Sequence, residues 1–314
     1  MNLDLSVIIH VNKNITSDKI LTEFPDLSNY PNITIIKCQF TDFTKLNDLS
    51  TLTKLTELYC DYNELTELPD LSQCVNLVKL TCGNNNLTKL PDLSKCIKLE
   101  YLYCFNNKLT ELPDLSKCVN LQKLSCINNE LIKLPDLTNL TKLIYLQVSE
   151  NKLKQLPNLS TLTNLTTLKC NNNNLCKLPD LKHLINLQHL NCMNNELTEL
   201  SILPINLIHI NCAYNKLTYI PNLLHLHKIK NINCSNNNLT ILPLTVNYLS
   251  CYDFNNNNLF SITNNFLEYK KYKIWYNIKY NKYNYITNLS PILNNLIEQT
   301  YYKKYIQYFD NMYK

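Results

Sequence analysis

A pattern of apolar and polar positions about 22 residues long repeats through most of the chain. One copy begins at Leu121 and has leucine at its first, fourth and eleventh positions, cysteine at its sixth and asparagine at its ninth. Leu124 and Cys126 alternate with polar residues, which predicts a short strand with one buried face. The ninth position holds asparagine in ten successive copies: Asn63, Asn85, Asn107, Asn129, Asn151, Asn173, Asn195, Asn215, Asn237 and Asn257.

Each copy is too small to bury its own apolar face, so the copies must stack on one another. With a degenerate first copy around Thr41, eleven units lie between about residues 33 and 262. Strands about 4.8 Å apart would give a parallel sheet about 50 Å long. The ninth-position amide can bond to backbone groups that the turn leaves unpaired. The Leu-Pro-Asp-Leu-Ser stretch that follows predicts an extended or 3₁₀ segment, because proline fixes φ and Asp and Ser accept turn bonds.

The pattern resembles the leucine-rich repeat, L-x-x-L-x-L-x-x-N-x-L, with cysteine in place of the third leucine, over roughly three quarters of the chain. Two shortened units, at 201–207 and 240–244, look like the short units of bacterial effectors. Abundant Asn, Lys, Ile and Tyr, with the L-P-D-L-S turns, look most like leucine-rich repeat proteins of giant amoeba-infecting viruses such as mimivirus. The resemblance implies an α/β-type solenoid, curved, with a parallel sheet on its concave face and extended or 3₁₀ segments on its convex face.

The two ends differ from the repeats. Residues 1–32 hold one half-matching unit and are expected to cap the first strand. Residues 263–314 lose the repeat and become rich in tyrosine and lysine. Ser290-Pro291 is typical of a helix start, and the apolar residues that follow lie on one helical stripe. We therefore predict three parts: an N-terminal cap (1–32), the solenoid (33–262) and a helical C-terminal cap (263–314).

Most of the 14 cysteines occupy the sixth position of a unit, which faces the core. A column of thiols along a stack gives a line of ligands instead of the tetrahedron that zinc requires. Parallel side chains on neighbouring strands also rarely reach the torsion of a disulfide. We expect buried free thiols that act as small hydrophobic groups, and no metal.

Composition excludes several classes of function. The single glycine, Gly83, rules out a glycine-rich phosphate loop. No Ser/His/Asp or Cys/His set converges, so we expect no enzyme activity, no cofactor and no small-molecule substrate. No apolar run approaches the 18 residues of a membrane span, and Met1–Asn14 lacks a basic signal region. The expected location is cytoplasmic, in a host or a virion if the protein is viral.

Aromatic side chains gather where strand residues point away from the core, at the third, fifth and seventh positions. Tyrosine and phenylalanine dominate the energetics of protein interfaces, so this cluster predicts a partner-binding surface on the sheet. A shallow notch near Gly83 would lie between its rings. The alternative is that the cluster has no function, because in a chain with 21 tyrosines some rings must point outward by chance. The predicted partner-binding residues are Tyr59, Tyr62, Tyr101, Tyr103, Phe105, Ile127 and Tyr145.

The whole net charge of +5 lies in the tail that follows residue 259. Its lysines alternate with tyrosines and with Trp275, so they could contact phosphates or an anionic membrane surface. A capping role alone would explain the same composition. A third possibility is an adaptor that recruits host ubiquitination machinery through one end. The lysines of the nucleic-acid or membrane hypothesis are Lys270, Lys271, Lys273, Lys279 and Lys282.

Overall fold

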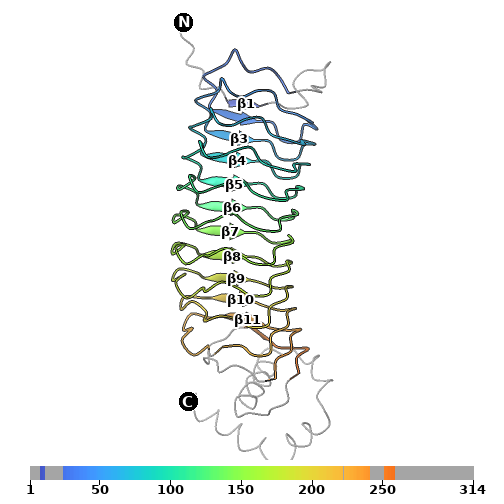
Figure 1. Ribbon diagram of the computed structural model, residues 1–314, viewed down its shortest axis with the longest axis vertical. Coiled ribbons are helices and arrows are strands. Elements are labelled where there is room, and N and C mark those ends of the chain that lie inside the picture. Colours follow the sequence, from blue (N-terminus) through green and yellow to red (C-terminus); the bar gives the residue numbers. More distant parts are fainter. Residues whose placement is uncertain (1–7, 11–23, 222, 241–250, 259–314) are drawn as a thin grey trace, which may run out of the picture. The chain divides into compact units, whose positions relative to one another are not determined.

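The computed structural model describes residues 8–10, 24–221, 223–240 and 251–258. Within them, short strands form one parallel sheet in which every strand pairs with its neighbours in sequence (Figure 1). The strands are β1 Ile8–His10, β2 Ile35–Lys37, β3 Glu57–Tyr59, β4 Lys79–Thr81, β5 Tyr101–Tyr103, β6 Lys123–Ser125, β7 Tyr145–Gln147, β8 Thr167–Lys169, β9 His189–Asn191, β10 His209–Asn211, β11 Asn231–Asn233 and β12 Cys251–Asp253.

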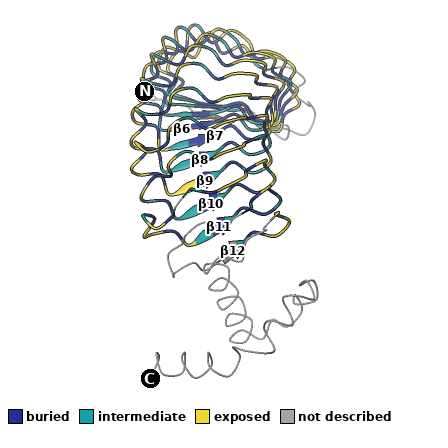
Figure 2. Ribbon diagram, turned by 60° about the horizontal axis from the view of Figure 1, so that its bottom comes forward, coloured by how far each residue is buried: buried dark blue, intermediate teal, exposed yellow. Residues whose placement is uncertain are grey.

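The core is the leucine ladder that the repeat predicts. Leu121, Leu124 and Leu131 are fully buried, as are their equivalents in the neighbouring units. Leu102, Leu124 and Leu146 are direct register partners on β5, β6 and β7, so each middle leucine packs between two others. Figure 2 shows the strands mostly buried or half-buried, while the turns at the edges of the stack are exposed. Burial therefore comes from stacking, as expected for units that have no core of their own.

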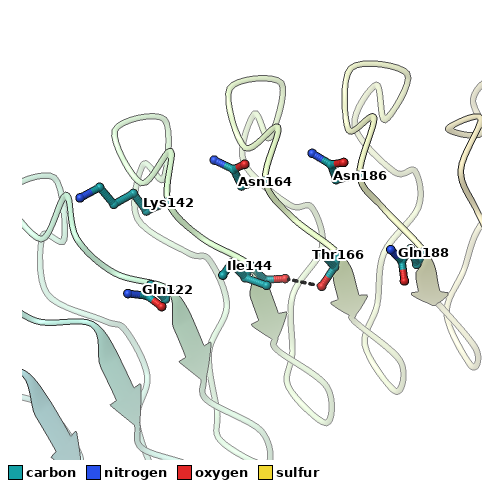
Figure 3. Close-up of a pocket in the computed structure, with 7 residues that line it drawn as sticks. All are labelled: Gln122, Lys142, Ile144, Asn164, Thr166, Asn186 and Gln188. Carbon is teal, nitrogen blue, oxygen red and sulfur yellow. Dashed lines mark hydrogen bonds between the residues drawn. The ribbon is translucent and has the colours of Figure 1, made fainter.

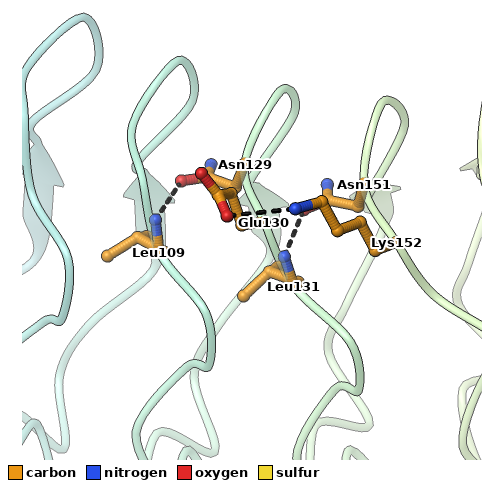
Figure 4. Close-up of polar contacts among 6 residues, drawn as sticks. All are labelled: Leu109, Asn129, Glu130, Leu131, Asn151 and Lys152. Atoms are coloured by element: carbon orange, nitrogen blue, oxygen red, sulfur yellow. Dashed lines mark hydrogen bonds and ion pairs between the residues drawn. The ribbon is translucent and has the colours of Figure 1, made fainter.

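The ninth-position asparagines form a buried hydrogen-bond ladder, which confirms their predicted role. Asn129 donates from Nδ2 to the carbonyls of Cys104 (3.0 Å), Cys126 (3.2 Å) and Ile127 (3.1 Å). Its Oδ1 accepts the backbone N–H of Leu109, in the preceding unit, at 3.0 Å (Figure 4). One side chain thus ties two units together through backbone groups that no strand pairing reaches.

Asparagine also serves the turn that follows each strand. The eighth residue of every unit from the second to the eleventh has a φ between 50° and 57°. Seven of these ten residues are asparagine, which tolerates the left-handed region better than most side chains. Among them, Asn84, Asn106 and Asn128 also join by side-chain bonds of 2.7 and 3.1 Å. The chain therefore makes repeated left-handed turns without glycine.

The outer segments are extended runs followed by two tight turns, so the expected α/β class does not hold for the described residues, which contain no helix. In the second unit, Cys74 N–H bonds to Leu71 carbonyl and Leu77 N–H to Cys74 carbonyl. Asp70 accepts from both the N–H and the hydroxyl of Ser72, at 2.9 and 2.7 Å. Most outer segments begin with proline, which lacks a backbone N–H, and their next residues are held in turns by local bonds of this kind. Too few residues remain to form a helical turn.

The sheet extends into the segment expected to cap it. β1 pairs in parallel with β2, with Ile9 opposite Ile36, so the stack starts before residue 33. Phe24 and Leu27, from the half-matching unit, are buried. The chain divides into two compact units, Met1–Phe260 and Ser261–Lys314. The predicted helical cap and the tail lysines lie outside the described residues.

The cysteines of the ladder are buried, as predicted. Of the thirteen whose state the structure gives, all are free and only Cys176 is exposed. Burial raises the pKa of the Cys104 and Cys170 thiols to about 12. Along this ladder the Cys212 thiol donates to the sulfur of Cys234 at 3.1 Å. The Cys104 and Cys170 thiols therefore carry protons at neutral pH, and the buried cysteines pack as apolar side chains.

Native thiol labelling should follow this burial. With a maleimide at neutral pH, we expect Cys176 to react first. The thiolate is the reactive species, and the buried thiols are shielded from the reagent. Peptide mass spectrometry would assign each label, and Cys176→Ser should remove the fast event. Adding reductant should leave the melting temperature unchanged. A melting temperature that falls with reductant would mean that disulfides cross-link the units.

Candidate partner-binding face

The strand face is the surface made by the third, fifth and seventh residues of the units, on the side of the sheet away from the leucine core. It contains six of the seven predicted residues. Tyr59, Tyr101, Tyr103 and Tyr145 lie on the strands, while Phe105 and Ile127 come two residues after the ends of β5 and β6. All six are half-buried, so their neighbours on the face already cover part of each side chain.

Lysine side chains lie between these rings, a placement that alternation along single strands does not predict. Lys79 Nζ lies 4.7 Å from the Tyr59 ring centroid and 6.0 Å from that of Tyr101. Lys123 Nζ lies 5.8 Å from the centroid of Tyr101 on its other side. Farther along the stack, Lys169 Nζ is 6.0 Å from the Tyr145 centroid. Each contact is at cation–π range, so ammonium groups and rings hold one another in place.

Hydroxyl groups fix two rings along their own strands. The Tyr59 hydroxyl donates to Glu57, and the Tyr145 hydroxyl donates to Gln147. Burial is the main cause that raises the pKa of Tyr59 to about 12, and the Glu57 bond adds to it. Tyr59 therefore remains a neutral hydrogen-bonding group at physiological pH.

The notch expected beside Gly83 is filled, and this corrects the sequence interpretation. The Phe105 ring lies over Gly83, with Cζ 2.6 Å from the point where a Cβ on residue 83 would stand. Beneath it, the buried Asp61 carboxylate accepts the hydroxyl of Thr81 and, at 2.8 Å, the N–H of Gly83. Alternation along the strand predicts that the Phe105 ring points away from the sheet. Because residue 83 has no side chain, the ring packs onto the Gly83 backbone instead.

Glycine at residue 83 is thus required for space, since its φ is not positive. Gly83→Ala should lower the free energy of unfolding by about 1–3 kcal/mol, the usual cost of overpacking. In a Phe105→Ala background the same change should cost clearly less, which a double-mutant cycle in denaturant would measure. Equal costs in both backgrounds would show that the ring does not occupy this space in solution.

Tyr62 stands apart from the other predicted residues. It is the left-handed residue of its turn, with a φ of 57°. Its ring stacks on Phe40, with centroids 4.4 Å apart and planes 16° apart, and 48% of the residue is exposed. Tyr62 and Phe40 form an exposed aromatic pair at the edge of the sheet, beside the strand face and not on it.

The strand face changes character over β8–β11. His189 and His209 stack with centroids 4.9 Å apart and planes 9° apart. Asn231 Nδ2 lies 2.7 Å from His209 Nδ1. Desolvation, with help from His189 and Lys230, lowers the pKa of His209. A hollow of about 260 Å³ lies over these strands and is lined mainly by polar side chains, among them Lys169, His189, Asn191, His209, Asn211 and Asn231.

A second hollow, of about 440 Å³, lies at the edge where the chain enters β6–β9 (Figure 3). Amide side chains line it at equivalent places in successive units, including Asn164 and Asn186. Each of these two donates to a carbonyl of the preceding unit, at 2.9 Å. The hollow is therefore built from groups that already hold the stack together.

Within the described ranges, no three histidine, cysteine, aspartate or glutamate side chains are arranged to hold a metal ion. No helix in that part of the chain is long and apolar enough to cross a bilayer. Aspartates of the outer turns accept local bonds, such as those that Ser94 donates to Asp92, so their role is to cap these turns.

The stacked parallel strands, the asparagine ladder and the unit length define a solenoid of the leucine-rich-repeat type. The family model for leucine-rich repeats in two copies matches residues 53–95 and again 97–139. These residues are therefore leucine-rich repeats. No curated protein matches the sequence.

Solved structures of bacterial proteins share the architecture. The functional domain of InlJ from Listeria monocytogenes, described as including a cysteine ladder, is 35% identical, with a TM-score of 0.69 over 76% of this chain and 52% of that one. The chain thus spans about half the length of that structure. YopM, a leucine-rich effector protein from Yersinia pestis, is 28% identical, with a TM-score of 0.58 over 76% of each chain. A Leptospira interrogans leucine-rich repeat protein, 24% identical with a TM-score of 0.57 over 76% of this chain and 70% of that one, shows the fold alone.

Proposed function

We propose that this chain is a non-enzymatic module that binds a protein partner through its strand face. The leucine-rich-repeat fold is typical of protein-interaction modules and generally serves as a scaffold without catalysis. The observation that carries the proposal is the group of half-buried tyrosines on β3–β7, held between lysines. Rings that are already ordered lose little side-chain entropy on binding, which favours an interface.

Tyr103 is the best single probe of this surface. It lies at the centre of the face, and unlike Phe105 it does not fill space over Gly83. A random peptide library displayed on phage, panned against the full chain, would supply binders without knowledge of the natural partner. We expect Tyr103→Ala to weaken the selected peptides by about 1–2 kcal/mol, the loss typical of an interface anchor. Stability should change little.

Tyr219→Ala is the matched control, because Tyr219 is 49% exposed and lies off the strand face, in an outer segment. Selected peptides should bind this variant as they bind the original chain. Peptides that bind all three proteins equally would contradict the proposed surface. The same result would leave the fold itself unaffected.

The other functional hypotheses stay predictions. Binding of nucleic acid or an anionic membrane through Lys270 and its neighbours falls on residues outside the described part of the chain. Retention of the full protein on heparin, with a salt titration, would test it. A role as an adaptor for ubiquitination machinery, a cytoplasmic location and a viral source depend on the sequence resemblance and composition alone.

A further inference from the structure

The units of β4 to β11 contribute no carboxylate to the strand face. At the third, fifth and seventh positions of these eight units there is no aspartate or glutamate, although the chain contains 25. The ionisable groups with cationic forms are Lys79, Lys123, Lys169, His189 and His209. Glu57 lies on β3 and Asp61 follows this strand, and the Asp61 carboxylate accepts bonds from Thr81 and Gly83 at the β4 end of the face. Glu100 and Glu150 border the face at its two edges. One surface of the solenoid is thus selectively positive.

Among the described residues, no ion pair joins Lys123 or Lys169 to a carboxylate. Lys79 differs, because it lies opposite Glu57 in the sheet register and its charge acts on Asp61. Ion pairs such as Glu130 to Lys152, Asp180 to Lys182 and Glu196 to Lys216 lie away from this surface. Lys169 is half-buried and rests against the Tyr145 ring instead of a carboxylate. A partly desolvated ammonium without a counter-charge gains more from an incoming anion than a solvated one does.

The spacing of these charges fits one extended chain. Lys79 and Lys123 stand at the same level on strands two apart, about 10 Å along the sheet. Acidic residues three apart in an extended peptide are separated by about 10 Å as well. The hollow over β8–β11 then offers imidazole and amide donors, with Asn191, Asn211 and Asn233 among its lining residues.

We propose that the strand face between β4 and β11 docks an extended acidic segment of a protein partner. The face lysines pair with its carboxylates, and the hollow at β8–β11 receives one further acidic side chain. This inference rests on the proposed function and adds the chemistry of the partner. Single-stranded nucleic acid fits less well, because bases need free aromatic faces and lysines already lie over Tyr59 and Tyr101.

A labelled peptide of about ten glutamates would test this, since in extended form it reaches about 33 Å, close to the span from β4 to β11. The comparison probes are the same peptide with serine in place of glutamate and a deoxythymidine oligonucleotide of similar length. Binding to the full chain would be followed by fluorescence anisotropy. The key variant is the triple change Lys79→Gln, Lys123→Gln, Lys169→Gln. Its control is Lys89→Gln, Lys133→Gln, Lys177→Gln, which removes equal charge from exposed residues of the outer segments.

We expect the glutamate peptide to bind more tightly than the serine peptide. The triple change of the strand-face lysines should weaken binding of the glutamate peptide by about tenfold. The triple change of the outer lysines should weaken it by less than about twofold. Equal binding of the two peptides, or equal losses in both triples, would overturn the acidic-segment proposal. Tighter oligonucleotide binding through the same lysines would overturn it in favour of nucleic acid. Peptides selected by display that depend on Tyr103 but lack acidic residues would leave the proposed function intact while this inference fails.

Discussion

Leu124→Ala should lower the free energy of unfolding by about 2–5 kcal/mol, among the largest single-residue effects expected in this chain. Leu124 is fully buried and sits in register between Leu102 and Leu146. Removing it deletes contacts with both neighbouring units and leaves a cavity that a stack pinned by hydrogen bonds closes only in part. Chemical denaturation followed by circular dichroism would measure the loss.

The damage from Leu124→Ala should also be local, because each unit of a solenoid contacts only its neighbours. Hydrogen exchange should accelerate around β5–β7 and change least at the ends of the stack. Ile132→Ala is the control within the same unit, since Ile132 is 62% exposed and should cost less than about 0.5 kcal/mol. Unchanged exchange at β5–β7 would contradict the observed register.

The fold follows from the sequence because its two determinants are local and repeated. Alternation around Leu124 and Cys126 predicts strands with one buried face, and the ninth-position asparagine predicts the backbone ladder; the structure contains both. The spacing could not reveal β1, because Ile8–His10 has no full repeat around it. It also left extended and 3₁₀ structure both open for the outer segments, which in the structure are extended runs closed by turn bonds such as Ser72 to Asp70.

The candidate site was less predictable, since it depends on where side chains turn. Alternation placed Tyr59, Tyr101 and Tyr103 on the strand face, where they lie. It could not tell that Phe105 folds over Gly83, because one missing Cβ in the neighbouring unit decides that direction. The lysines were overlooked for a similar reason: a charged residue on a face is usually solvated, and only cross-strand register brings Lys79 to Tyr101.

Asn129→Ala should cost about 2–4 kcal/mol, more than an average hydrogen-bond deletion, because of what it leaves unpaired. The N–H of Leu109 loses the acceptor that Asn129 supplies and remains buried. The carbonyl of Cys104 loses one of two amide donors, since Asn107 also reaches it, at 3.2 Å. Denaturation midpoints would give the cost, and Asn139→Ala, at an exposed asparagine, should be nearly neutral.

Because Asn107 and Asn129 both donate to the Cys104 carbonyl, changing the two together gives a sharper prediction. With Asn107→Ala and Asn129→Ala together, the Cys104 carbonyl loses both amide donors, so the double change should exceed the sum of the single ones by about 0.5–3 kcal/mol. Asn107 and Asn173 share no acceptor, because Asn173 donates to Val148, Cys170 and Asn171. Their double change should therefore be additive within about 0.5 kcal/mol. If both pairs proved additive, the asparagines would act as independent caps, and the ladder would not be what couples one unit to the next.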